Sequence, residues 1–348
     1  MKRIKILIIL ITSTLLFLHL NGETKTLKIM AMNTWHGGKQ VKNGIEKIAN
    51  IIEKIDPDIV SFSEIREEDW TKNLVEILKK KQLKYEFKFL KKSDVSLISK
   101  YPIKDASIIF QKANSAVKYT LTISKHTLVV VSTHLDFKSY ASNLPRGYNT
   151  GSKKYPKWGM INNGKGKPKP ITDVNIILKN NATSERENQI SMILKEIKNE
   201  TAPIIIVGDF NEPSFLDWTT KTKNLFAHNG TIIEWPSTKI LYNNGFTDAF
   251  RKIYPDEVKN PGITWPSLVT GHKPTTWAPL SDDRDRIDYI FYKGKKINPI
   301  SFAIVGPKES YAYKKLTKEF TKNENFLATD MPWPSDHKSI MAKLKITW

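Results

Sequence analysis

Six short polar clusters carry the residues with which this chain could do chemistry. Each lies at one end of an apolar run typical of a β-strand, where a rigid sheet can present side chains to a shared cleft. The candidate residues are Asn33, Glu64, His134, Asp209, Asn211, Asp288, Asp336 and His337. Taken singly, each has an ordinary explanation, such as turn formation or a satisfied imidazole. Together they offer carboxylates, amides and two imidazoles without a thiol, a set suited to a hard cation and phosphoryl chemistry.

The composition predicts a folded protein that attracts polyanions. The 348 residues include 55 Lys and Arg against 35 Asp and Glu, which gives a formal net charge of +20, and 40% of them are hydrophobic. The hydrophobic share excludes a disordered polyelectrolyte, and the lack of cysteine excludes disulfide scaffolds, thiol catalysis and Cys-based metal sites. The charge favours nucleic acid, a phosphorylated substrate or an anionic membrane surface as partner, and no obligate protein partner is inferred.

Two other chemistries receive less support. His36, His126, His228 and His272 show neither an HxxxH spacing nor clustering, which argues against a zinc enzyme. A non-catalytic module that only binds polyanions is a second alternative. The completeness of the site argues against it, because a chain that had lost hydrolysis would be expected to lack at least one of its residues. The residues present are Glu64, Asp209, Asn211, Asp288, Asp336 and His337.

Residues 1–22 have the pattern of a secretory signal peptide. Three cations, Lys2, Arg3 and Lys5, precede an apolar stretch from Ile6 to Leu20 and a short polar exit. An uncleaved membrane anchor is the alternative, but the stretch falls short of the roughly 20 apolar residues of a spanning helix. We therefore expect export to the periplasm or the medium.

The hydrophobic periodicity predicts an α/β protein. Helices are expected at 40–55 and 184–199, where apolar residues recur every three or four positions. Strands are expected at 27–33, 58–65, 95–99, 106–110, 119–124, 127–133, 203–207, 286–292, 301–305 and 340–346. Short strands with helices between them indicate an α/β sandwich. Without an internal repeat or a dividing linker, residues 25–348 are expected to form a single domain.

Residues 138–183 form a basic insertion within this domain. They contain nine Lys and Arg residues against the single acid Asp173, and they begin a few residues after His134. Long segments of this kind are either functional or disordered. The two interpretations are a solvated surface loop and a positively charged lip that captures a phosphate-bearing substrate.

The polar clusters, taken in order, carry a family resemblance. The segments MNTWHGG, DIVSFSEI, STHLD, IIIVGDFNEPS, DRDRIDYIF and SDHKSI resemble the endonuclease/exonuclease/phosphatase superfamily, which is deoxyribonuclease I-like. The resemblance runs from about Leu27 to Thr347, and its strength lies in the order of the motifs. It implies a four-layer α/β sandwich, in which two packed mixed β-sheets are flanked by helices, with a metal site at one rim.

The resemblance also implies roles for the candidate residues around the metal. Glu64 would be the principal ligand of Mg²⁺, with Mn²⁺ or Ca²⁺ as alternative ions. Asn33 and Asp336 would support the ion directly or through water. One firm carboxylate with helpers suits Mg²⁺, which prefers oxygen ligands and retains several waters.

The remaining candidates would be catalytic. Asp209 would orient or deprotonate the attacking water, and Asn211 would bind a phosphate oxygen. His337, with its ring set by Asp288, would contact the scissile phosphate, and His134 would contact it from the other side. The implied reaction is in-line attack of water on a phosphorus ester.

The substrate is less constrained than the reaction. The His-Leu element at His134 argues against the apurinic-endonuclease branch of the superfamily. An exported nuclease is favoured by the positive charge, because cationic grooves gain affinity for nucleic acid through counterion release. A sphingomyelinase-like enzyme or another phosphodiesterase or phosphatase acting on small phosphate esters is the alternative. Aromatic residues could serve base stacking or a lipid surface equally, namely Tyr140, Tyr148, Tyr155, Trp158, Trp265 and Trp277.

Overall fold

A computed structural model describes residues 22–348, apart from 89, 113, 157, 163, 165, 270, 319–323 and 328–331. Apart from residue 22, the predicted signal peptide lies outside the described residues. Within the described part of the chain, no helix combines the length and the apolar character needed to cross a bilayer.

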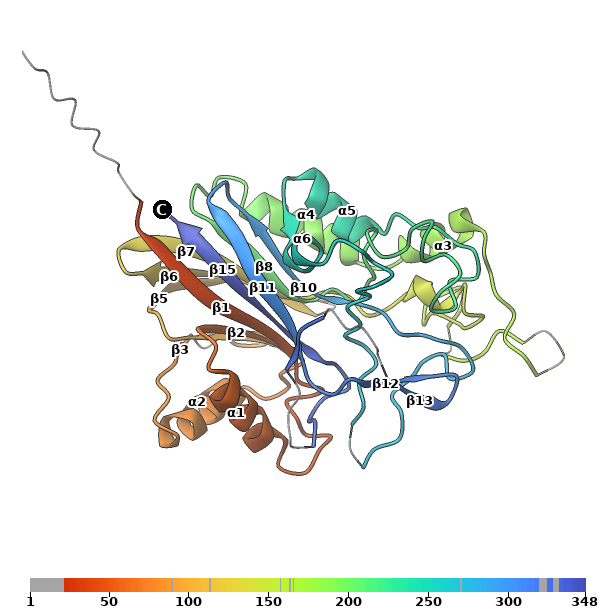
Figure 1. Cartoon of the computed structure of the whole chain (residues 1–348), viewed down its shortest axis with the longest axis horizontal. Helices are drawn as coiled ribbons and strands as arrows, with labels where there is room; N and C mark the ends of the chain where they lie inside the picture. Colours follow the sequence, from red (N-terminus) through yellow and green to blue (C-terminus); the bar gives the residue numbers. More distant parts are fainter. Residues whose placement is uncertain are drawn as a thin grey trace, which may run out of the picture.

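Two β-sheets form the centre of the molecule (Figure 1). The seven-stranded sheet has the order β14 (Phe326–Leu327), β11 (Ile297–Val305), β15 (Ser339–Thr347), β1 (Thr24–Asn33), β2 (Ile59–Ser63), β4 (Val95–Ser99) and β3 (Glu86–Phe87). The six-stranded sheet has the order β5 (Ile103–Phe110), β6 (Ser115–Ile123), β7 (His126–His134), β8 (Ile204–Asp209), β10 (Asp288–Lys293) and β9 (Thr247–Asp248). Both sheets are mixed, because β1 and β2 pair in parallel, as do β7 and β8, and most other pairs are antiparallel.

The alternation of side chains along the strands explains why the sheets are covered on both faces. In β1, Ile29 and Ala31 join the core between the two sheets, whereas Met30 and Met32 face the opposite way. In β8, Ile205 faces the inter-sheet core and its neighbours face outward. Because successive strand residues point to opposite faces, a continuous apolar run requires a partner layer on each side.

Helices supply the two outer layers. The helices α1 (Gly44–Ile55) and α2 (Trp70–Lys80) pack on the larger sheet, whereas α4 (Arg186–Glu196) and α5 (Pro236–Asn243) cover the smaller one (Figure 1). Two further helices are α3 (Val174–Asn181) and α6 (Ala249–Ile253). This arrangement confirms the predicted four-layer α/β sandwich. The prediction missed α2, although Trp70, Leu74 and Leu78 recur at helical spacing and are all buried.

The basic insertion is folded into the domain. It contains a 3₁₀ turn at Ala141–Asn143 and the helix α3, and its apolar residues share a core cluster with Trp218 and Trp235. Arg146, which the sequence suggested as part of a cationic lip, is fully buried and forms a two-pronged ion pair with Asp285. The expectation was therefore wrong for this residue, because its charge is neutralised inside the protein.

A further element was not anticipated. The strands β12 (Glu309–Ala312) and β13 (Lys315–Lys318) form a separate two-stranded hairpin joined by Tyr313 and Lys314. Figure 1 shows this hairpin away from the two main sheets.

Candidate active site

The predicted site residues meet at one edge of the two packed sheets. Asn33, His134 and Asp209 are the last residues of β1, β7 and β8, and Glu64 directly follows β2. The register places Asp209 opposite both His134 of β7 and Asp288, the first residue of β10. Strand pairing thus brings together residues that are far apart in the sequence.

Asp209 lies at the centre of this group. Its Oδ2 atom accepts a hydrogen bond of 2.9 Å from Nδ2 of Asn33, and it lies 3.6 Å from Nε2 of His134 and 3.7 Å from Nε2 of His337. The same Asn33 nitrogen also donates to Oε1 of Glu64 over 3.3 Å. Glu64 is therefore joined to the Asp209 and His337 pair through a single amide group.

Each imidazole is held by a carboxylate on its far nitrogen. Nδ1 of His337 lies 3.0 Å from Oδ2 of Asp288, as the resemblance implied. Nδ1 of His134 lies 2.7 Å from Oδ2 of Asp94, a residue that the sequence analysis did not identify. These contacts fix the ring orientations and leave both Nε2 atoms directed at Asp209. No motif surrounds Asp94, so only the fold could reveal its role.

The carboxylate partners change the charge of the two rings. Burial opposes the protonated form of His134, but Asp94, followed by Asp209 and Glu64, raises its pKa to about 9. Burial likewise opposes protonation of His337, but Asp288 and Asp209 raise its pKa to about 10. Both rings are therefore cationic at neutral pH and suited to contact an anionic phosphate.

The acids of the site are perturbed in different directions. Burial raises the pKa of Asp209 to about 6 and that of Asp336 to about 7. Burial also acts to raise the pKa of Glu64, but the nearby imidazoles of His134 and His337 outweigh it and lower that pKa. Asp209 thus has a proton affinity close to neutral pH, which is useful for a group that accepts a proton from water.

Two sets of residues can be tested for their fit to a metal ion. Asp209, Asp288 and His337 offer donor atoms that lie within 4.8 Å of one another, but Asp288 and His337 already contact each other. Glu64 and Asp336 line an open cavity, and Oδ1 of Asp336 is buried without a hydrogen-bond partner among the described residues. An oxygen set that opens to solvent fits a hard cation such as Mg²⁺ better than a closed His–Asp pair does.

Two predicted site residues contribute through their amide groups. Asn33 turns its NH₂ toward the carboxylates, because its Oδ1 accepts a hydrogen bond from the backbone N–H of Trp35. It therefore orients Glu64 and Asp209. Asn211 donates its backbone N–H to Oδ1 of Asp209 and its side-chain amide to the carbonyl of Leu135, and it also lines the cavity.

The cavity beside these residues has a volume of about 370 Å³ and an aromatic wall. The aromatic residues that line it are Trp35, Phe137, Tyr140, Trp265 and Trp277. The same cavity is lined by the site residues His134, Glu64, Asp336 and His337. A ligand in this cavity would touch both charged groups and ring surfaces.

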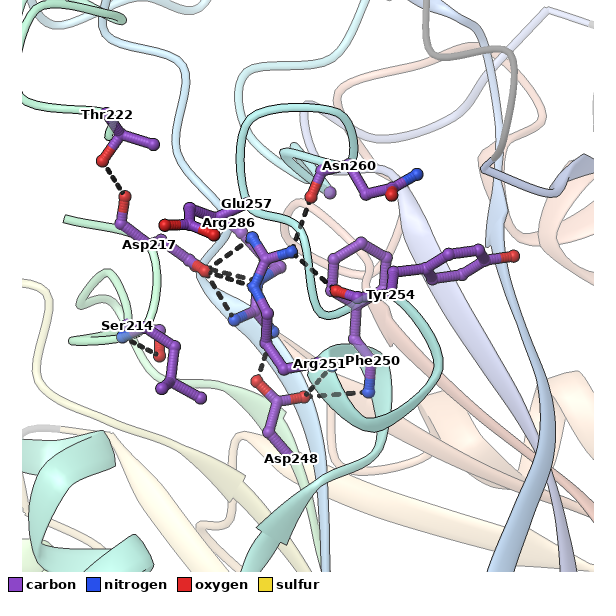
Figure 2. Close-up of polar contacts among 12 residues, drawn as sticks. Ser214, Asp217, Thr222, Asp248, Phe250, Arg251, Tyr254, Glu257, Asn260 and Arg286 are labelled. Atoms are coloured by element: carbon purple, nitrogen blue, oxygen red, sulfur yellow. Dashed lines mark hydrogen bonds and ion pairs between the residues drawn. The ribbon is translucent and has the colours of Figure 1, made fainter. Parts of the chain in front are cut away.

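A buried ion-pair network anchors the strand that carries Asp288. Figure 2 shows Arg286, two residues before Asp288, between the carboxylates of Asp217 and Asp248, with Arg251 sharing Asp217. Arg286 contacts Asp248 over 2.6 Å and Asp217 over 2.9 Å. The arginine of the DRDRIDYIF segment therefore positions the start of β10, and with it the partner of His337.

Comparison with known proteins agrees with this geometry. A sequence model of the Endonuclease/Exonuclease/phosphatase family matches residues 30–337. The chain belongs to this family. Its members are in general hydrolases of phosphoester bonds, which are typically metal-dependent.

A sequence relative supports the family, and solved structures confirm the fold. An uncharacterised protein of Caenorhabditis elegans is 32% identical over 269 residues, covering 77% of this chain and 79% of the relative. The structure of a family member from Leptotrichia buccalis has a TM-score of 0.50 at 18% identity, covering 91% of this chain and 99% of that one. A structure of D. rerio TDP2 complexed with single strand DNA product has a TM-score of 0.51 at 17% identity, covering 92% and 98%.

Proposed function

We propose that this protein is a metal-dependent phosphodiesterase that hydrolyses nucleic acid. The observation that carries the proposal is the convergence of two carboxylate-held imidazoles on Asp209, beside a cavity lined by Glu64 and Asp336. A phosphodiester is anionic and repels hydroxide, so a hydrolase must neutralise the phosphate and position the water.

The residues of the site can perform both tasks. Asp209, with its pKa of about 6, is mostly ionised at neutral pH and can accept the proton of the attacking water. The cationic rings of His134 and His337 can donate hydrogen bonds to phosphate oxygens, and one of them can protonate the leaving oxygen. The Nε2 atoms of His134 and His337 lie 3.6 and 3.7 Å from the same oxygen of Asp209. The imidazole acids and the carboxylate base can therefore act on the same phosphate ester.

A divalent cation would complete the charge balance. Glu64 and Asp336 would hold it, and when bound it would supply Lewis-acid stabilisation of the phosphate oxygens. Asn33 keeps Glu64 in place for this task through its amide hydrogen bond. Ser335 fixes the neighbouring backbone by donating its hydroxyl to the carbonyl of Asn33 over 2.7 Å.

Nucleic acid is favoured as the substrate by three observations. The formal charge of the chain is +20, and the cavity has a wall of aromatic rings on which bases can stack. In addition, D. rerio TDP2, which shares the fold, has been seen with a single strand DNA product.

A phospholipid headgroup is the second candidate substrate. The hairpin of β12 and β13 exposes Tyr313 and Leu316, which are 54% and 53% exposed, next to Lys314 and Lys315. Apolar side chains beside cations are a common means of contacting an anionic membrane surface.

The proposal is tested by a panel of substrates assayed with Mg²⁺ and with EDTA. We expect hydrolysis of bis(p-nitrophenyl) phosphate and of DNA or RNA, abolished by EDTA, by Asp209→Ala and by His337→Ala. Near-normal turnover by purified, folded Asp209→Ala protein would refute the role given to that residue. Release of phosphocholine from sphingomyelin with inert nucleic acids would favour the second candidate.

A further inference from the structure

A second groove opens beside the catalytic cavity and shares two lining residues with it. Thr276 and Trp277 line both spaces, so the groove, with a volume of about 410 Å³, continues the cavity outward. Its other lining side chains come from the basic insertion, the 279–280 turn and the β12–β13 hairpin, namely Tyr148, Trp158, Met160, Pro279, Leu280 and Lys314.

Trp158 forms an exposed aromatic surface in this groove. Trp158 is 39% exposed. The centroid of its ring lies 4.4 Å from the ring centroid of Trp277, at an interplanar angle of 34°. Trp277 in turn contacts the rings of Tyr140 and Trp265 in the catalytic cavity. A row of ring contacts therefore leads from the cavity to the partly exposed side chain of Trp158.

The loop that carries Trp158 is held in place by the backbone. Tyr148 and Met160 form a β-bridge, and the N–H of Asn149 donates to the carbonyl of Gly159 over 2.8 Å. Gly151 has a φ of +71°, and a Cβ atom there would lie 2.5 Å from the ring of Trp158. A glycine at this position lets the indole lie against the backbone, so the ring is positioned before any ligand binds.

We propose that this groove is a base-binding subsite, in which a nucleobase flanking the scissile phosphate stacks against the exposed part of the Trp158 indole. This inference rests on the proposed function. It assigns a binding site to a part of the substrate that lies outside the catalytic cavity. Because Trp277 and the backbone at Gly151 already cover parts of the Trp158 ring, the base contacts the part of the indole that these two leave exposed. Aromatic stacking tolerates any base, so the subsite binds a single strand without sequence preference.

The surroundings of Trp158 suit a nucleotide better than an acyl chain. Lys314 lines the groove, and its ammonium group can pair with a backbone phosphate. The ring surfaces of Trp158 and Trp277 provide flat π faces, whereas an acyl chain is bound by enclosing aliphatic walls.

The subsite is tested by comparing a short and a long substrate in the full-length protein. We expect Trp158→Ala to raise KM for a fluorescent single-stranded oligonucleotide about tenfold, the usual effect of losing one stacked base. KM for bis(p-nitrophenyl) phosphate, which ends at the catalytic cavity, should be unchanged. Trp158→Phe should restore most of the oligonucleotide KM. Tyr242→Ala removes a similarly exposed aromatic residue on α5, outside both spaces, and should have no effect.

The outcomes separate this inference from the proposed function. An unchanged oligonucleotide KM in Trp158→Ala, with the wild type active, overturns the subsite and leaves the phosphodiesterase intact. If the wild type cleaves neither substrate, the proposed function fails, and oligonucleotide affinity measured by fluorescence anisotropy decides the subsite. Equal affinities of wild type and Trp158→Ala overturn it. Weaker binding of Trp158→Ala to phosphatidylcholine–sphingomyelin vesicles, with unchanged oligonucleotide affinity, also overturns it in favour of a lipid contact.

Discussion

The His134–Asp94 pair allows a sharp test of the electrostatics at the site. We predict that Asp94→Asn lowers the pKa of His134 while leaving the ring buried. Asn is nearly isosteric with Asp and can still accept a hydrogen bond from Nδ1, which lies 2.7 Å from Oδ2 of Asp94. The substitution therefore removes a charge with little change in packing.

The expected magnitude follows from the environment of the ring. The pKa of His134 is raised from 6.5 to about 9, and Asp94 is the largest of the groups that raise it. The net difference corresponds to about 3 kcal/mol between the two protonation states. Asp209 remains 3.6 Å away in the variant and retains part of the effect. We expect the pKa of His134 to fall by roughly one to two pH units.

The same change alters how stability depends on pH. Because the pKa of His134 is raised in the folded state, its protonated form stabilises the protein below pH 6.5, and this contribution is lost as the pH rises toward about 9. Asp94→Asn should reduce this loss between pH 6.5 and 9. It should also move the alkaline limb of the pH–rate profile toward neutrality.

The pKa of His134 is measured by an NMR titration of the imidazole Cε1–H signals in the presence of EDTA, so that no metal perturbs the titration. The pH–rate profile is then measured with Mg²⁺. Asp105→Asn, an exposed aspartate on β5, is the matched control and should leave both measurements unchanged. A His134 pKa that stays near 9 in Asp94→Asn would show that Asp94 is not the source of the shift, and would refute the reasoning.

Three further predictions concern the scaffold and the insertion. Arg286→Gln leaves the buried carboxylate of Asp248 without its ion-pair partner and leaves the half-buried Asp217 with Arg251 alone. We expect it to reduce the free energy of unfolding by about 3–5 kcal/mol in urea denaturation, and a loss below 1 kcal/mol would contradict the anchoring role. Gly208 has a φ of +145°, and a Cβ atom there would clash with the backbone carbonyl of Thr133 in β7. We therefore expect Gly208→Ala to lower the Tm and abolish activity. An unchanged Tm would argue against the β7–β8 register. Reversal of Lys167 and Lys169 to Glu should weaken DNA binding and reduce the slope of log K against log salt concentration by roughly one to two, measured by fluorescence anisotropy. An unchanged slope would show that these lysines of the insertion do not contact the DNA.

Much of the scaffold is readable from the sequence because short-range physics dominates it. The predicted strand at 95–99 has the same bounds as β4, and the helix predicted at 184–199 contains α4. Apolar periodicity and turn residues act locally, so a window of a few residues contains the needed signal. The β12–β13 hairpin was missed because its residues alternate weakly and its pairing stands apart from the main sheets.

For the site, local patterns identified the residues that end strands, and the order of the motifs indicated the family. Tertiary structure decided which of these residues meet and which unmarked ones join them. Asp94 became the partner of His134 because β2 and β4 pair in the sheet facing β7, a contact without local sequence signal. Arg146 was counted as a surface cation, yet it is buried against Asp285, which lies far along the chain. Composition and spacing therefore determine chemical type and local conformation, whereas burial and charge pairing depend on long-range packing and are decided only when the sheets come together.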